Sequence, residues 1–136
     1  MMSRLLLLSV GLTLAAWAAD PPEGVTRAAD VVTRTAPPGS ASVRLLARGS
    51  HAFLGELTMA PGAEVPVHRD ATEEIIYVRE GGGTMTMDGV SFPLAAGDSV
   101  VMPPNAEVSF VNGDATTVVV QVFAGPEPAA KYDAWK

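Results

Sequence analysis

The sequence of 136 residues contains no cysteine, so disulfide bonds, thiolate nucleophiles and thiolate metal sites are excluded. Charged residues are also scarce, at 18%, and 9 Lys plus Arg stand against 15 Asp plus Glu, which gives a net charge of -6. Nucleic acids and anionic membranes attract cationic surfaces, so we expect neither as a partner. With 48% hydrophobic residues the chain can bury a core, and its length suits one domain.

The longest apolar run lies near the start of the chain. Arg4 precedes apolar and small residues from Leu5 to Ala16, and Ala16-Trp17-Ala18 has the small-x-small pattern of a signal-peptidase site. The run is too short for a membrane span, which needs roughly 20 apolar residues. We therefore interpret residues 1–18 as a cleaved signal peptide, with a retained anchor as the alternative. The expected location is secreted or periplasmic, without stable membrane insertion after cleavage.

Short β-rich runs separated by Gly or Pro turns fill most of the remaining sequence. An N-terminal arm at 19–42 contains one expected strand, at 30–35. Asp88-Gly89 is the clearest hairpin signal, because a two-residue primed turn requires positive φ. Strands about ten residues apart predict an all-β sandwich or closed barrel over 43–124. The nine strands expected there are 43–47, 52–59, 64–68, 74–79, 84–87, 91–94, 98–102, 107–111 and 116–124.

The tail at 125–136 lacks a strand pattern. Its last ten residues are expected to form at most a turn of helix. Tyr132 and Trp135, three residues apart, would allow this turn to cover a barrel opening or contact a partner.

One stretch combines glycine, histidine and acidic residues at fixed spacing. It consists of Gly62, five residues, His68, one residue, Asp70, three residues, Glu74, six residues and Gly81. This pattern resembles the first signature motif of the cupin superfamily. Every spacing matches, but a second His usually stands at the position of Asp70.

A second stretch resembles the other cupin motif. It consists of Gly97, five residues, Pro103, one residue, Asn105, two residues, Val108, three residues and Asn112. Asn105 replaces a Gly, an exchange that left-handed backbone tolerates. Val108 replaces a His that is normally a metal ligand.

The resemblance extends from about residue 43 to residue 124. It implies an antiparallel jelly-roll barrel (a double-stranded β-helix) that is often dimeric and has a ligand pocket inside. In many members three His and one Glu hold a divalent metal. We therefore expect an all-β barrel of the cupin type. A homodimer is one expected assembly, with Tyr77 outside the barrel and able to serve an interface.

The residues themselves suggest a site. His68 and Asp70 are two apart and project to the same face of an extended strand, and Glu74 opens the next strand and can enter the same cavity. One imidazole and two carboxylates favour Mn(II) or Fe(II), with positions open for water or substrate. The candidate metal ligands are His68, Asp70 and Glu74, and the candidate ligand pocket adds Met102.

A metal-free interpretation has at least equal weight. Two of the four metal positions that the resemblance implies have lost imidazole, and of the replacements only Asp70 can coordinate. His68 would then be a partly exposed residue of a charged hairpin. Glu107 points to the opposite face from Val108 by period-two alternation, so we do not expect it to replace the lost ligand. His51 has no partner at ligand spacing, so we expect His51 at the rim or surface.

Methionine offers one more alternative. Thioether sulfur together with His68 can hold Cu(I), so copper is a less favoured cofactor. In the simpler interpretation the methionines fill gaps in the barrel core. The four concerned are Met59, Met85, Met87 and Met102.

Three functions follow from this sequence. The first is a barrel that binds a small organic ligand, with or without a degenerate divalent-metal site. The second is a Mn- or Fe-dependent enzyme of the dioxygenase, decarboxylase or isomerase type. A metal-free enzyme could instead use His68 as base, and a carboxylate buried in an apolar barrel would have a raised pKa. The third is a structural or interaction barrel without a ligand.

Overall fold

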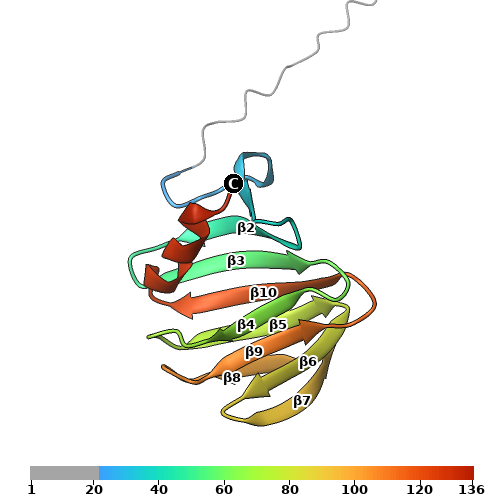
Figure 1. The fold of residues 1–136 in the computed structure, drawn as a ribbon. Coiled ribbons are helices and arrows are strands. Elements are labelled where there is room, and N and C mark those ends of the chain that lie inside the picture. Colours follow the sequence, from blue (N-terminus) through green and yellow to red (C-terminus); the bar gives the residue numbers. More distant parts are fainter. Residues whose placement is uncertain (1–21) are drawn as a thin grey trace, which may run out of the picture.

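Ten strands and two short 3-10 helices form residues 22–136, the part of the chain that this computed structural model describes (Figure 1). The predicted signal peptide, residues 1–18, lies outside the described residues. No helix within residues 22–136 has the length and apolar character that a membrane crossing requires. The strands are β1 (Val32–Thr35), β2 (Ala41–Arg48), β3 (Ala52–Met59), β4 (Glu64–His68), β5 (Glu74–Glu80), β6 (Gly82–Met87), β7 (Val90–Ala95), β8 (Ser99–Met102), β9 (Val108–Asn112) and β10 (Thr117–Ala124), and the helices are η1 (Ala28–Asp30) and η2 (Glu127–Ala134).

The strands form two antiparallel sheets. The larger has the order β1-β2-β3-β10-β5-β8, and the smaller has the order β4-β9-β6-β7. Several neighbouring strands are far apart in sequence, as when β10 pairs with both β3 and β5. The predicted all-β antiparallel jelly roll is confirmed, and the nine strands expected at 43–124 are all present within about two residues of their predicted bounds.

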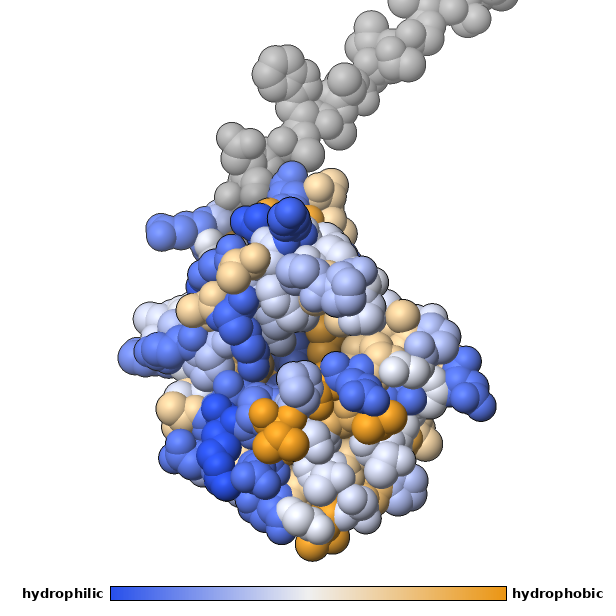
Figure 2. Space-filling model, in the orientation of Figure 1, coloured by the Kyte–Doolittle hydropathy of each residue, from blue (hydrophilic) through white to orange (hydrophobic). Residues whose placement is uncertain are grey.

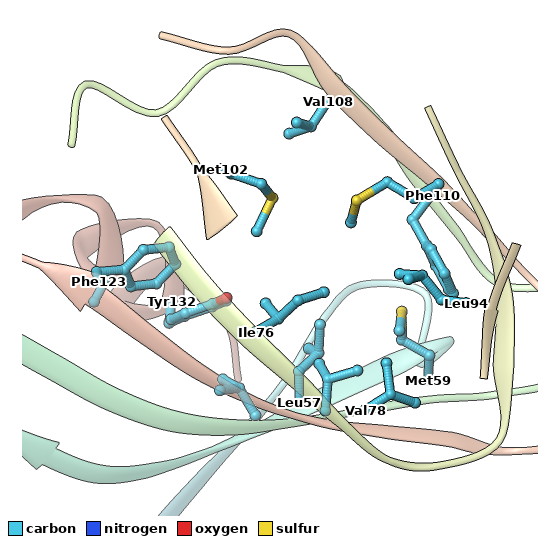
Figure 3. Close-up of a cluster of buried hydrophobic side chains, with 14 of the residues drawn as sticks. Leu57, Met59, Ile76, Val78, Leu94, Met102, Val108, Phe110, Phe123 and Tyr132 are labelled. Atoms are coloured by element: carbon cyan, nitrogen blue, oxygen red, sulfur yellow. The ribbon is translucent and has the colours of Figure 1, made fainter. Parts of the chain in front are cut away.

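Side-chain alternation places the core between the sheets. On β5, Glu74, Ile76 and Val78 are buried, whereas Ile75 and Tyr77 are exposed. Tyr77 is 48% exposed on the outer face, as the alternation predicted. Figure 3 shows the buried side chains that gather inside the barrel from both sheets.

The turns follow the sequence signals. Asp88 and Gly89 have φ values of 48° and 82° and join β6 to β7 with Met87 paired to Val90, so the predicted two-residue hairpin is confirmed. Asn105 has φ 62°, the left-handed conformation that its position in the second motif led us to expect.

Both ends of the described chain add to the barrel. The expected strand in the arm is β1, and it pairs with β2 as the edge of the larger sheet. Since β2 begins at Ala41, the predicted boundary between 42 and 43 falls inside a strand. The tail forms η2, which is longer than the single turn expected, and its last residue Lys136 exchanges backbone hydrogen bonds with Thr35 of β1.

Aromatic packing and an ion pair hold η2 against the sheet. Tyr132 is buried and stands edge-on to Trp135, with ring centroids 4.9 Å apart. It also contacts the ring of Phe53, which stacks on Phe123. Arg48 reaches the carboxylate of Asp133 at 3.2 Å and the carbonyl of Ala129 at 3.3 Å. The tail is therefore part of the folded unit.

Asn112 ties two turns together inside the fold. Its Nδ2 donates to the carbonyl oxygens of Met59, Ala60 and Ala115 at 3.2, 2.7 and 3.0 Å, and its Oδ1 accepts from the Thr117 hydroxyl. The side chain is buried, so water cannot replace these bonds. The last residue of the second motif therefore has a structural role.

We predict that Asn112→Ala lowers the free energy of unfolding by about 3 kcal/mol, because several buried carbonyl groups lose their donor. Urea unfolding followed by circular dichroism measures this loss. The matched control is Asn105→Gly, which keeps the left-handed turn and should change stability by less than about 1 kcal/mol. Equal stability of the two variants would contradict the structural role of Asn112.

Candidate functional site

The barrel interior holds a cavity of about 560 Å³ between the two sheets. Its wall is apolar over most of its extent, and Figure 3 shows Leu57, Ile76, Met102 and Phe110 around this space. On the face drawn in Figure 2, hydrophobic residues are visible in a recess. The apolar residues that the sheets contribute are Ala41, Leu57, Met59, Val65, Pro66, Ile76, Val78, Met85, Leu94, Met102, Val108, Phe110 and Val119.

A chain of hydrogen bonds forms the polar end of the cavity. The Tyr132 hydroxyl donates to Gln121 Oε1 at 2.9 Å, and Gln121 Nε2 donates to Glu74 Oε1 at 3.0 Å. All three side chains are buried and line the cavity, and Glu74 is only 6% exposed. They come from three elements, η2, β10 and β5, so the chain exists only in the complete fold.

Burial changes the acid–base properties of this end. Desolvation raises the pKa of Glu74 from 4.5 to about 7, against the lowering effect of the nearby Lys131 ammonium. The negative charge of Asp70 raises this pKa further, and the hydrogen bond from Gln121 lowers it. Burial also raises the pKa of Tyr132. Glu74 is thus only partly ionised at neutral pH, as the sequence led us to expect for a carboxylate in an apolar barrel.

His68 and Asp70 lie at the mouth of the same cavity. His68 Nδ1 donates to the carbonyl oxygen of Pro66 at 2.9 Å, which directs Nε2 toward Asp70. Nε2 lies 3.6 Å from Asp70 Oδ2, which is longer than a hydrogen bond. The Lys131 ammonium lies closer to Asp70, at 3.1 Å from Oδ2 and 3.4 Å from Oδ1.

The four candidate pocket residues, His68, Asp70, Glu74 and Met102, therefore all line the cavity. Among residues 22–136, however, no three His, Cys, Asp or Glu side chains are grouped so that they could hold a metal ion. The Asp70 carboxylate is paired with Lys131, the Glu74 carboxyl is hydrogen-bonded to Gln121, and Val108 offers no ligand atom. Divalent cations require several available ligand atoms, so these residues do not fit one.

The other residues weighed from sequence lie elsewhere or pack. His51 is exposed. Glu107 does not line the cavity, but it pairs at 2.8 Å with Arg69, which does. Three of the four methionines, Met59, Met85 and Met102, are buried cavity-lining residues, and Met87 is partly buried beside the core.

Two residues of the site were missed by the sequence reasoning. Gln121 is the one polar residue in the run VVVQVFA of β10, and period-two alternation with Val119 and Phe123 would have placed it inside. Lys131 had no comparable signal, because its position depends on how η2 packs.

Comparisons with known proteins agree with this architecture. The sequence profile of the cupin domain family matches residues 55–123. Among solved structures, an RmlC-like cupin from Shewanella frigidimarina superposes with a TM-score of 0.67 at 23% identity, covering 74% of this chain and 88% of that chain. At this identity the similarity concerns the fold.

Two curated proteins are similar in sequence. The uncharacterized protein MJ1618 of Methanocaldococcus jannaschii is 36% identical over 58 residues, which are 42% of this chain and 46% of that protein. Auxin-binding protein 1 of Arabidopsis thaliana is 28% identical over 89 residues, which are 57% of this chain and 45% of that protein. The matched regions span about half the length of these relatives.

The raised pKa of Glu74 predicts how stability depends on pH. The folded state binds the Glu74 proton more tightly than the unfolded state, in which the pKa of Glu74 is near 4.5. Protonation of Glu74 therefore stabilises the folded state. This stabilisation is complete below pH 4.5 and is lost as the pH rises to about 7. The loss amounts to about 3 kcal/mol.

The Glu74→Gln variant carries no charge at this position and should lack that loss. We predict that the free energy of unfolding of the native protein falls relative to that of the variant when the pH is raised from 5 to 8. Urea titrations at both pH values measure it. A difference that is the same at both values would show that Glu74 titrates as an ordinary carboxyl.

Proposed function

The chain belongs to the cupin family, and from this premise we propose that its barrel binds a small, uncharged and mainly apolar organic molecule with one polar group. The observation that carries the proposal is the cavity of about 560 Å³ with an apolar wall and one polar end. Pockets for small molecules have this size and this combination of surfaces. A barrel with a purely structural role would be expected to fill its interior with side chains.

The polar end determines how the ligand would be oriented. Glu74 Oε1 already accepts a hydrogen bond from Gln121, whereas no described residue donates a hydrogen bond to Glu74 Oε2. Glu74 Oε2 is therefore the group for a ligand hydroxyl, amide or carbonyl. Its carboxyl can accept a hydrogen bond when ionised and donate one when protonated. The apolar part of the ligand would lie among Met85, Met102 and Phe110.

Charge balance favours an uncharged ligand. Lys131 compensates the charge of Asp70 at 3.1 Å, and burial favours the neutral form of Glu74. A charged ligand would lose its hydration in the apolar interior, where the lining residues Lys131 and Arg69 are already paired with Asp70 and Glu107.

Other considerations agree with a binding role. Auxin-binding protein 1, one of the similar proteins, is named for binding auxin. A metal-dependent reaction has less support, because the residues at the mouth do not fit a divalent cation. From the predicted signal peptide we infer that this binding role lies outside the cytoplasm, in a secreted or periplasmic protein.

The neutral fluorescent probe N-phenyl-1-naphthylamine tests the proposal. The chain without residues 1–18 keeps one tryptophan, Trp135, which lines the cavity, so energy transfer from Trp135 to the probe reports on binding at this site. Val108→Phe would fill part of the cavity, since Val108 is buried in its wall. We predict that this variant binds the probe at least about tenfold more weakly than the native protein.

The matched control is Val111→Phe on the same strand, where the side chain is 49% exposed and points away from the cavity. This variant should bind the probe as the native protein does. Equal affinity of all three proteins, each shown to be folded by circular dichroism, would mean that the probe does not enter the barrel and would count against the proposed cavity site. The anionic probe 8-anilinonaphthalene-1-sulfonate should bind more weakly than the neutral one.

A further inference from the structure

We propose that the side chain of Lys131 supplies the positive charge next to Asp70 and Glu74 and thereby replaces a metal cation. The two sequence motifs and the site differ in one respect. The motifs retain His68 and Glu74 at metal-ligand positions, yet the contacts among the described residues do not assemble a metal site. What stands next to Asp70 is an ammonium group from the tail.

The ammonium of Lys131 is held on several sides. Both oxygens of Asp70 lie within 3.4 Å of its Nζ. Nζ also lies 5.0 Å from the centroid of the Phe123 ring and 5.7 Å from that of Tyr132, distances at which aromatic faces attract a cation. Its attraction also reaches Glu74, whose pKa it lowers. Lys131 therefore interacts with the carboxyl groups of both Asp70 and Glu74.

The position of Lys131 is fixed by the packing of η2. Its sequence neighbour Tyr132 is buried, and the Tyr132 hydroxyl donates a hydrogen bond to Gln121. Asp133 of the same helix pairs with Arg48, which also donates a hydrogen bond to the carbonyl of Ala129. The lysine thus reaches the cavity from a segment that is itself anchored at several points.

The residues at the motif positions match this arrangement. Asp70 stands where the motif usually has a second His, and a carboxylate pairs with an ammonium where an imidazole would bind a metal. Val108 stands at the position of the last His and offers no ligand atom. Lys131 lies outside residues 55–123, which match the family profile, so the charge comes from a part of the chain that the profile does not include.

This arrangement also limits the chemistry of the cavity. An ammonium group offers hydrogen-bond donors and a fixed charge but no coordination positions for water or substrate. The barrel would keep its charge balance without any metal supply. This role of Lys131 is a property of the protein alone and does not depend on which molecule the cavity binds.

Metal titration by isothermal calorimetry tests the proposal, with MnCl₂ and ZnCl₂ as the probes. The chain has two lysines, Lys131 and Lys136, so Lys136→Met is a matched control for Lys131→Met. We expect no saturable binding up to millimolar metal for the native protein and for Lys136→Met. Lys131→Met should bind at least about tenfold more tightly than these, because it removes the positive charge that repels a cation.

Further variants locate the effect. Lys131→Arg keeps the charge and should behave as the native protein, and adding His68→Ala to Lys131→Met should abolish the gained affinity. Micromolar binding by the native protein would overturn the proposal. So would a folded Lys131→Met variant that binds no more tightly than the native protein.

A second measurement needs no substitution at Lys131. Carbon-13 NMR of reductively methylated protein resolves the two lysines and reports on ZnCl₂ added to the otherwise native chain. The Lys131 signal should stay unchanged. Its movement, without movement of the Lys136 signal, would mean that zinc displaces the ammonium, and would overturn the proposal even if the Lys131→Met variant failed to fold.

Discussion

Glu74 imposes the requirement around which the polar end of the barrel is organised, because a carboxyl group buried among aliphatic side chains must be hydrogen-bonded or lose its charge. Both responses occur here. Gln121 and, behind it, Tyr132 supply the hydrogen bonds, and burial raises the pKa of Glu74 to about 7. The carboxyl can therefore face an apolar cavity at neutral pH with only part of the cost of a buried charge.

The same requirement explains why the tail is part of the fold. Tyr132 can reach Gln121 only if η2 lies against the end of the barrel. Once it does, Lys131 of the same helix lies beside Asp70. Hydrogen bonding, aromatic packing and charge compensation thus all depend on the docking of one short helix.

Local patterns in the sequence predicted most of the barrel and part of its site. The alternation in β5 and the turn at Asp88 and Gly89 depend on near neighbours, so both were predictable. The placement of His68, Asp70, Glu74 and Met102 on the cavity wall also agrees with strand periodicity and motif spacing. The pattern does not show which of these side chains are already paired within the protein and which are available to a ligand.

The remaining features depend on contacts between distant segments. Lys131 lies 61 positions from Asp70, and nothing in the local sequence of the tail indicates their contact. The pairing of β1 with β2 and of Thr35 with Lys136 likewise depends on the assembled sheet. One consequence concerns the order of synthesis. The residues that close the polar end follow the last barrel strand, so η2 leaves the ribosome after every strand of the barrel. Until η2 docks, Gln121 lacks its hydrogen bond from Tyr132, so this docking is the step that completes the polar end.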